Sequence, residues 1–402
     1  MRLSSNIEKV IRDIAASGSS GRSFYVYELT PMVSKIAGLR SALPERVEIF
    51  YAMKANPHPA FLRAALDAGI GGVEIASIGE GKKAIEAGFS PKQIVFTGPG
   101  KSPEELRWAA TTGIRLVHIE SLTEAHRLNS ICSELGTTQN ILIRVNPNFQ
   151  VHGAQATFSG DSSKFGIDQN QFLDKLHLII ALSNLSVQGL HVYSASGVLV
   201  ASDLLENCRR VFELASVVSE RHHVDLCKVI DFGGGFGIDY LETGADFSLP
   251  EYASGLKALI ARYGYEDRQF VLELGRYLAA DSGWYCSEIL DIKSSLGVKQ
   301  VVCQGGSHHF RRPVALKINH PTSIVSIGRP PVFEEQEEVV DEEAFIGGAL
   351  CNSADKLTAE PIVIQHARIG DIFVVGLAGA YGYSMSHLDF LSHERPEEVV
   401  VP

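Results

Sequence analysis

Residues 72–121 read "GVEIASIGEGKKAIEAGFSPKQIVFTGPGKSPEELRWAATTGIRLVHIES", and this stretch alternates short apolar runs with amphipathic ones. The runs "GVEIAS", "QIVFTG" and "RLVHIES" have the length and apolar content of buried strands, whereas "IGEGKKAIEAG" and "SPEELRWAATTG" have helical periodicity. In the second helix pattern, Ser102, Pro103 and Glu105 form an N-cap, a first-turn proline and the acidic arm of a capping box. Strands that are joined by helices pair in parallel, so this stretch predicts successive strand–helix units.

The same alternation continues on both sides of this stretch. Five further runs are strand candidates: "RVEIFYAM", "NILIRVNP", "VQGLHVYS", "CKVIDFG" and "QFVLELG". Helix patterns between them are "PAFLRAALDAG", "LTEAHRLNSICSELG" and "DLLENCRRVFELASVVSE". Eight strands over roughly 230 residues fit a closed barrel better than an open sheet. We therefore predict an α/β fold with a TIM-like (β/α)8 barrel.

After about residue 280 the pattern becomes strand-rich, with the segments "WYCSEILDIKSS", "VKQVVCQGG", "FEEQEEVVDEEAFIGG" and "DIFVVGLAGA". These segments predict a second, mainly β domain, with which the early "SFYVYEL" is expected to pair. We place the barrel at residues 28–279 and the β-rich domain at 1–27 and 280–402, with the extreme C-terminus as a segment that can return to the barrel. The charged run "EEQEEVVDEE" is expected to be a solvated loop or an edge strand.

Composition limits the possible functions. The chain has 402 residues, 45% of them hydrophobic, which suffices for two sizeable cores. A net charge of -11 argues against nucleic acid and anionic membranes as partners. The start "MRLSSNIEKVIRDIAASG" lacks the apolar core of a signal peptide and no later run has membrane-spanning length, so we expect a cytoplasmic protein. Six cysteines without a CxxC pair predict reduced thiols, no disulfide framework and no metal site.

Barrel enzymes place their chemistry at the carboxyl ends of the strands. A lysine there, Lys54, can form a Schiff base in a desolvated pocket. The three glycines at 233–235 expose consecutive N–H groups that suit a phosphate, and Arg276 adds positive charge. The carboxylate of Glu273 can hold a pyridine nitrogen protonated, while the imidazole of His191 can stack on a ring. Together these groups meet the requirements of pyridoxal 5'-phosphate.

Each feature also has a structural interpretation. Taken alone, Lys54 would more often be a surface lysine, and "DFGGGFG" a tight turn after a strand. The segment "GPGKS" imitates the end of a Walker A motif, but Val95 stands where the first glycine belongs. The joint placement of so many suitable groups at successive strand ends favours the cofactor site.

Eight segments, in order along the chain, resemble the fold-type III pyridoxal-phosphate decarboxylases, the group of diaminopimelate, ornithine and arginine decarboxylases. The matching segments are "YAMKANP", "VEIAS", "SSKFGI", "GLHVYSAS", "DFGGGFG", "ELGRYL", "GALCNSAD" and "GAYGYS". The resemblance covers nearly the whole chain. It implies an alanine racemase-like barrel with a β domain, and an obligate homodimer whose active sites are shared at the subunit interface.

The resemblance also implies roles for individual residues. Lys54 would carry the cofactor, His191 would stack on its ring, and Cys351, supplied by the partner subunit, would protonate the carbanion after carbon dioxide leaves. Glu273 would contact the pyridine nitrogen and Arg144 the phenolic oxygen. The whole cofactor-binding set would be Lys54, Glu74, Arg144, His191, Ser194, Gly233, Gly234, Gly235, Glu273, Gly275, Arg276 and Tyr381.

The substrate-binding segment departs from the better-known members. Diaminopimelate decarboxylases usually read C-E-S-x-D in this segment, and their glutamate binds the distal ammonium group of the substrate. This chain has Asn352 in place of that glutamate. It also has Gln304 at a position where an acidic residue is common. A basic cluster follows, so the predicted substrate-binding residues are His308, His309, Arg311, Arg312, Asn352 and Asp355. Such cations suit a neutral or anionic distal end. The alternative is that they form ion pairs at the dimer interface or solvate a loop.

This departure resembles the branch that acts in siderophore and aminoglycoside biosynthesis, on amino acids condensed with citrate or attached to a carrier. We therefore predict a pyridoxal-phosphate-dependent decarboxylase of a carboxylate-bearing siderophore intermediate. The runner-up is diaminopimelate decarboxylase of lysine biosynthesis, or another basic amino-acid decarboxylase. A racemase shares the cofactor but usually has an arginine at the ring nitrogen, where this chain has Glu273. A non-catalytic binding protein would not need to retain both Lys54 and Cys351.

Overall fold

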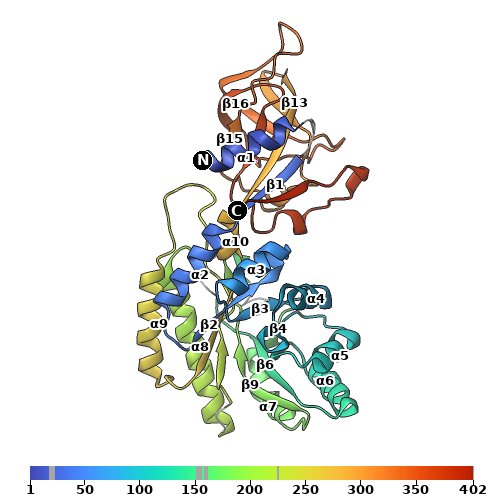
Figure 1. Cartoon of the computed structure of the whole chain (residues 1–402). Helices are drawn as coiled ribbons and strands as arrows, with labels where there is room; N and C mark the ends of the chain where they lie inside the picture. The colour runs from blue at the N-terminus through green and yellow to red at the C-terminus, as the bar shows by residue number, and fades with distance from the viewer. Residues whose placement is uncertain (18–22, 151–155, 158–161, 224–225, 402) are drawn as a thin grey trace. The chain divides into compact units, whose positions relative to one another are not determined.

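The computed structural model describes residues 1–17, 23–150, 156–157, 162–223 and 226–401 (Figure 1). The chain divides into two compact units. The barrel unit comprises Val33–Ile238 and Ala245–Leu278. The β-rich unit comprises Met1–Met32, Asp239–Gly244 and Ala279–Pro402.

Eight parallel strands form the barrel unit's sheet, and the pairing of β5 with β6 closes it. In spatial order they are β5 (Leu116–Ile119), β4 (Ile94–Phe96), β3 (Gly72–Ile75), β2 (Val47–Ala52), β12 (Gln269–Leu274), β11 (Val229–Asp231), β9 (Leu185–His191) and β6 (Gln139–Asn146). Apolar side chains from five of these strands pack together inside the barrel: Phe50, Val95, Leu116, Leu142 and Val271. The predicted (β/α)8 barrel is confirmed.

Helices connect these strands and cover the outside of the barrel. Those that the sequence patterns predict are α3 (Pro59–Asp67), α4 (Ile78–Ala87), α5 (Pro103–Thr112), α6 (Leu122–Leu135) and α8 (Ala201–His222). Three others match none of the helix patterns quoted above: α2 (Thr30–Ala42), α7 (Gln169–Ile180) and α9 (Leu249–Tyr263). The capping box of α5 is confirmed, because Ser102 Oγ accepts from the Glu105 N–H at 3.2 Å and Glu105 Oε2 from the Ser102 N–H at 3.0 Å.

Short elements lie at the strand ends and turns. They are η1 (Met53–Ala55), η2 (Pro91–Gln93), β7 (Ala156–Thr157), β8 (Ile167–Asp168), β10 (Ala195–Ser196), α10 (Arg276–Ala279), η3 (Ala280–Ser282), η4 (Tyr383–Met385) and η5 (Phe390–Ser392). Of these, η1 follows β2 directly and α10 follows β12, so both begin where a barrel strand ends.

An eight-stranded sheet forms the β-rich unit, as predicted. Its main path is β15 (Thr322–Val325), β18 (Ile372–Val375), β13 (Gly283–Ser295), β14 (Val298–Cys303), β16 (Val339–Gly347) and β17 (Ile362–Ala367). Strand β1 (Ser23–Glu28) pairs with β13, as expected for "SFYVYEL". Strand β19 (Glu397–Val401) pairs in parallel with β1 and so belongs to this sheet. The second half of "EEQEEVVDEE" lies in β16. Its residues 339–343 pair with β17, whereas the pairing of β16 with β14 begins only at Ala344, so among the described strands this run has the pairing of the expected edge strand.

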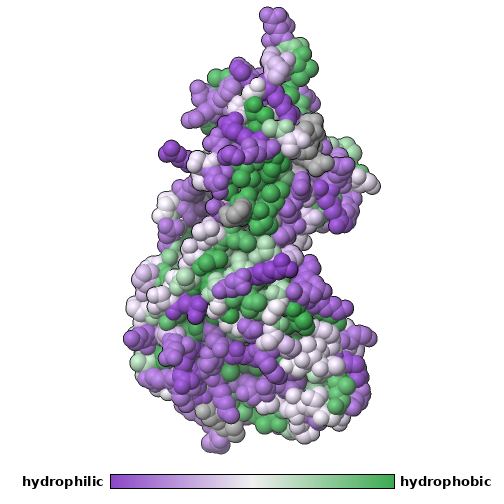
Figure 2. Space-filling model, in the orientation of Figure 1, coloured by the Kyte–Doolittle hydropathy of each residue, from purple (hydrophilic) through white to green (hydrophobic). Residues whose placement is uncertain are grey.

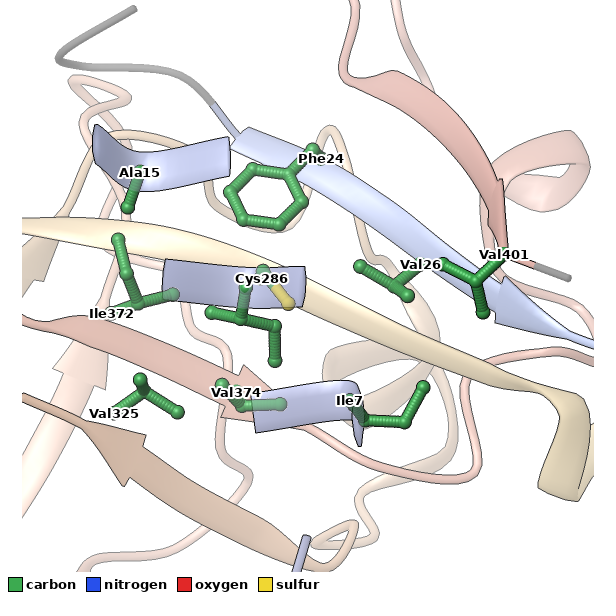
Figure 3. Packing of buried hydrophobic residues seen from close by; sticks show 10 residues of the cluster. Ile7, Ala15, Phe24, Val26, Cys286, Val325, Ile372, Val374 and Val401 are labelled. Atoms are coloured by element: carbon green, nitrogen blue, oxygen red, sulfur yellow. The ribbon is translucent and has the colours of Figure 1, made fainter. Parts of the chain in front are cut away.

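One helix covers this sheet and supplies part of its core (Figure 3). In α1 (Ser5–Ala16), Ile7, Ile11 and Ala15 recur at four-residue spacing and pack with Phe24, Val26, Cys286, Val325, Ile372, Val374 and Val401. Burying an aliphatic side chain of this size stabilises a fold by about 1.5–3 kcal/mol. The unit also contains the short helix α11 (Arg312–Leu316).

The outer surface is mixed in character. On the side that Figure 2 shows, polar and apolar side chains are interspersed over the barrel unit, whereas apolar side chains gather in one patch on the β-rich unit. Among the helices of the described residues, none has the length and apolar character needed to cross a bilayer.

Candidate active site

The carboxyl ends of the barrel strands bring the predicted cofactor residues of the barrel unit to one mouth. Because all eight strands are parallel and the sheet is closed, residues at these ends share one side of the barrel. The residues placed there are Lys54 in η1, Glu74 in β3, Arg144 in β6, His191 in β9, Gly233–Gly235 after β11, Glu273 in β12 and Arg276 at the start of α10.

The Lys54 amine is paired with a buried carboxylate. Its Nζ donates to Glu74 Oε1 at 3.1 Å and to Oε2 at 3.0 Å, and it lies 5.5 Å from the centre of the Tyr193 ring. The Glu74 side chain is 1% exposed, and the Lys54 side chain 38%. Burial raises the pKa of Glu74, while the Lys54 charge lowers it in part. The arrangement holds one amine at the barrel mouth, where it remains accessible to a ligand.

His191 and Glu273 face each other in the same mouth. His191 Nε2 lies 3.4 Å from Glu273 Oε2, and the two residues are 1% and 3% exposed. Burial lowers the pKa of His191 well below its ordinary value, so its ring is neutral. Within the described part of the chain, neither nitrogen of this ring has a hydrogen-bond partner. A flat neutral ring beside a carboxylate matches the surroundings that a protonated pyridine needs.

Glycine is required in the turn after β11. Asp231 Oδ1 accepts from the Gly233 N–H at 2.8 Å, and Gly233 has φ +64°. A Cβ on Gly234 would lie 2.4 Å from the Glu273 carbonyl oxygen, which no side chain tolerates. Gly275 is also tightly placed, since its Cβ would lie 2.9 Å from that of Ala55. Backbone therefore comes close to backbone at this rim.

Hydroxyl groups and a guanidinium complete the rim. Arg276 Nη2 lies 3.5 Å from Ser196 Oγ, and Ser194 and Ser196 are 2% and 9% exposed. Glycine amides, hydroxyls and an arginine together are a donor set suited to a phosphate. The residues of the barrel mouth thus fit pyridoxal phosphate at its aldehyde, ring and phosphate ends.

Arg144 is held by a residue that the sequence analysis missed. Its Nη1 donates to Glu120 Oε1 at 2.9 Å, and both side chains are almost fully buried. The Glu120 carboxylate also accepts from the N–H groups of Gly98 and Gly166, each at 2.9 Å. Burial alone would raise the pKa of Glu120, but Arg144 and Lys101 hold it below its ordinary value. Glu120 therefore fixes the guanidinium that the resemblance assigns to the cofactor.

Two other buried residues are absent from the predicted site set. His118 and Asp231 join His191 and Glu273 in a cluster whose ligand atoms all lie within 4.8 Å of one another. Such a set could also hold a divalent ion, which the prediction of no metal site did not consider. No sequence signal marked His118, because it sits inside the apolar run "RLVHIES" and reads as a strand residue.

The β-rich unit contains a pocket that three of the predicted substrate residues share. Its volume is about 210 Å³, and its lining is Ser307, His308, Arg311, Val314, Leu350, Asn352, Ala354, His387 and Phe390. His308 is 1% exposed, and its ring nitrogens have no hydrogen-bond partner among the described residues. Burial lowers the pKa of His308 to about 4, so this ring is neutral. Arg311 is exposed and contacts His387 Nε2.

Two of the other predicted substrate residues have contacts within the β-rich unit around this pocket. Arg312 is 1% exposed, lies 4.2 Å from the Tyr240 ring and donates to His320 Nε2 at 3.0 Å, so it is not a lining residue. Asp355 accepts from the Ser307 N–H at 2.6 Å and from the Leu350 N–H at 2.9 Å, which ties two loops together.

Three further candidates also lie in the β-rich unit. His309 is buried, and its ring is 3.8 Å from that of His308. Cys351 is an exposed free thiol. Tyr381 adopts φ +56°, a backbone region that a side chain of this size rarely occupies.

Comparison with known proteins agrees with this geometry. The family model described as "Pyridoxal-dependent decarboxylase, pyridoxal binding domain" matches residues 29–280. A Staphylococcus aureus protein named 2-[(L-alanin-3-ylcarbamoyl)methyl]-2-hydroxybutanedioate decarboxylase is 34% identical over 97% of this chain and 96% of its own length. The diaminopimelate decarboxylase of Campylobacter jejuni is 32% identical over 90% of this chain and 87% of its own length. The crystal structure of Helicobacter pylori diaminopimelate decarboxylase complexed with L-lysine shares the fold, with a TM-score of 0.85 and 24% sequence identity. The match covers 98% of this chain and 94% of that chain.

Proposed function

The chain belongs to the pyridoxal-dependent decarboxylases, and we propose that its substrate is an amino acid whose distal end carries carboxylate groups. The enzyme removes the α-carboxylate of an amino acid with pyridoxal phosphate as its cofactor. We place this step in siderophore biosynthesis, on an amino acid that is joined to citrate or to a similar acid.

The barrel residues have distinct tasks in this proposal. Bound pyridoxal phosphate supplies an electron sink for the bond that loses carbon dioxide. Lys54 binds the cofactor's aldehyde carbon, and Glu74 balances the charge of the free amine. Glu273 keeps a proton on the ring nitrogen, and His191 packs on the ring. The glycines at 233–235, with Ser194, Gly275 and Arg276, would hold the phosphate. The resemblance adds Tyr381 to this set.

One observation carries the substrate class. The 210 Å³ pocket of the β-rich unit contains Arg311, His308 and Asn352, and no carboxylate is among the described residues that line it. An arginine without a neighbouring acid attracts carboxylates and repels an ammonium group. The similar S. aureus protein is named for a substrate in which a butanedioate is linked through an amide to an alanine unit. A pocket of this charge suits the dicarboxylate end of such a molecule.

Diaminopimelate is the second candidate substrate, because diaminopimelate decarboxylases are also close relatives. Its distal end bears an ammonium group as well as a carboxylate, so it needs an acid in the binding site. Asn352 stands where these enzymes usually have that acid. This difference places diaminopimelate second.

The active enzyme is proposed to be a homodimer with shared active sites. In this arrangement Cys351 enters the partner subunit's site, where it returns a proton to the substrate carbon. Its exposure in the single chain supports this role. We propose a cytoplasmic location, which is supported by the six free cysteines, since thiols stay reduced there.

A release assay for carbon dioxide tests the substrate class. Purified enzyme is given a citrate amide of 2,3-diaminopropionate or free diaminopimelate, and the proposal expects faster release from the amide. Arg311→Ala should raise KM for the amide about tenfold, because a hydrogen bond between charged groups is lost. Arg107→Ala is the control, since Arg107 pairs with Glu134 on the barrel surface. Equal or faster turnover of diaminopimelate by the native enzyme would reverse the order of the two substrates.

A further inference from the structure

His118 clusters with His191, Asp231 and Glu273, yet none of the roles above uses it. It is 0% exposed and extends from β5. Three strands separate β5 from β12 in either direction round the closed barrel, so His118 faces Glu273 from the opposite side. A buried imidazole in such a place needs a physical reason.

The imidazole lies between two carboxyl groups. Its Nδ1 lies 3.8 Å from Glu273 Oε1, and its Nε2 lies 3.7 Å from Asp231 Oδ2. The His118 ring also packs against the His191 ring, with 4.4 Å between the ring centres and 33° between the ring planes. Neither His118 nitrogen has a hydrogen-bond partner among the described residues. The ring is therefore aimed at both carboxyl groups while making a full bond to neither.

Both contacts of His118 are longer than hydrogen bonds in the chain without ligand. Hydrogen bonds between nitrogen and oxygen are about 2.7–3.2 Å long. In ligand-free enzymes, contacts between catalytic groups are often longer than this and shorten on binding. Asp231 is already fixed, because its other oxygen accepts from the Gly233 N–H at 2.8 Å. His118 thus lies between Glu273 and the Asp231 that holds the glycine turn, and Asp231 also interacts with Glu273 directly.

We propose that His118 is a positioning residue whose Nδ1 orients the Glu273 carboxylate toward the cofactor's ring nitrogen, with Asp231 fixing the far side of the imidazole. This inference rests on the proposed contact between Glu273 and the ring nitrogen. The competing explanation is that His118 only fills space beside His191. Packing needs the shape of the ring, whereas positioning needs a donor at the place of Nδ1.

Substitutions at His118 separate these explanations. His118→Phe keeps a ring but removes both nitrogens. His118→Asn places an amide nitrogen near the position of Nδ1, facing Glu273, and His118→Gln places one near the position of Nε2, facing Asp231. Each apoenzyme is titrated with pyridoxal phosphate and with an analogue that has carbon in place of the ring nitrogen. Absorbance of the bound ligand gives each dissociation constant without any turnover.

Positioning predicts a selective loss. His118→Phe and His118→Gln should weaken binding of pyridoxal phosphate by about tenfold and leave the analogue's binding unchanged, whereas His118→Asn should stay near the native value. Equal weakening of both ligands in the Phe and Gln variants, or no rescue by Asn, would overturn the proposal.

Glu273→Gln separates this test from the proposed role of Glu273. The variant should remove the native preference for pyridoxal phosphate over the analogue. If Glu273→Gln leaves that preference intact, the contact between Glu273 and the ring nitrogen is wrong. If Glu273→Gln removes the preference and His118→Phe does not, only the role of His118 is wrong.

Discussion

Replacing Glu120 by glutamine should destabilise the barrel unit by several kcal/mol without a change in side-chain shape. The carboxylate is 2% exposed, and its partner Arg144 is 8% exposed at 2.9 Å. Removing one partner of a buried ion pair costs about 3–5 kcal/mol, because the other charge stays buried without compensation. Glutamine also replaces one acceptor oxygen by a donor. Because the N–H groups of Gly98 and Gly166 bond to different oxygens of Glu120, one of these two N–H groups then faces a donor.

The assay is urea unfolding followed by tryptophan fluorescence. Trp108 lies in α5 of the barrel unit and Trp284 in β13 of the β-rich unit, so a Trp284→Phe background makes the signal specific to the barrel. Glu134→Gln is the matched control. Its carboxylate pairs with Arg107 on the surface, with side chains 60% and 47% exposed, so it should change stability by less than about 1 kcal/mol.

The difference in the free energy of unfolding between the native and the Glu120→Gln protein should also depend on pH. Arg144 and Lys101 hold the pKa of Glu120 below its ordinary value in the folded state despite burial. A carboxylate whose pKa is lowered by folding stabilises the fold fully when the pH is above its pKa in the unfolded chain, which is about 4.3 for glutamate. This stabilisation is lost as the pH falls through the pKa of the folded state. The two proteins should therefore converge in acid. A Glu120→Gln loss no larger than that of Glu134→Gln, or one that is independent of pH, would refute the reasoning.

Three substitutions test other parts of the site. Lys54→Ala should abolish both the absorbance of bound cofactor and carbon dioxide release, and near-normal turnover would contradict the role of this amine. Cys351→Ala should leave the absorbance unchanged but slow product formation or misdirect the protonation, as measured by product analysis; unchanged kinetics and products would contradict its role. Gly234→Ala should weaken cofactor binding at least about tenfold in an absorbance titration, because the new Cβ meets the Glu273 carbonyl at 2.4 Å and shifts the turn. Gly100→Ala is its control, since nothing lies within 4 Å of that Cβ, and equal effects would contradict the explanation.

The barrel could be predicted because its strands are short apolar runs bounded by turns. In β3, for example, "GVEIAS" is buried on both faces and followed at once by an amphipathic helix. Helix α9 was missed although Ser248 caps it and Tyr252, Leu256 and Ile260 recur at four-residue spacing. Its signal was present in the sequence. Helix α7 has a weaker helical pattern in its sequence. Its last turns, "LHLII", are apolar at consecutive positions, so the apolar residues do not recur with the helical period of 3.6.

The limits of site prediction have a similar physical origin. Charged residues at strand ends, such as Lys54 and Glu273, stand out because parallel strands bring their carboxyl ends together. A polar residue within an apolar strand, such as His118, does not stand out, because only the closed barrel shows which groups it meets. In the basic cluster, the adjacent Arg311 and Arg312 point to different surroundings, one exposed and one buried against Tyr240. A run of charges does not reveal which of its members faces a ligand.

Borohydride reduction of the cofactor-loaded enzyme, followed by peptide mass spectrometry, tests the central claim most directly. Reduction makes the bond between an amine and the cofactor permanent, so the modified lysine can be identified. The account predicts that the cofactor's mass is found on the peptide containing Lys54, whose amine the structure places at the barrel mouth. Modification of a different lysine, or of none, would contradict it.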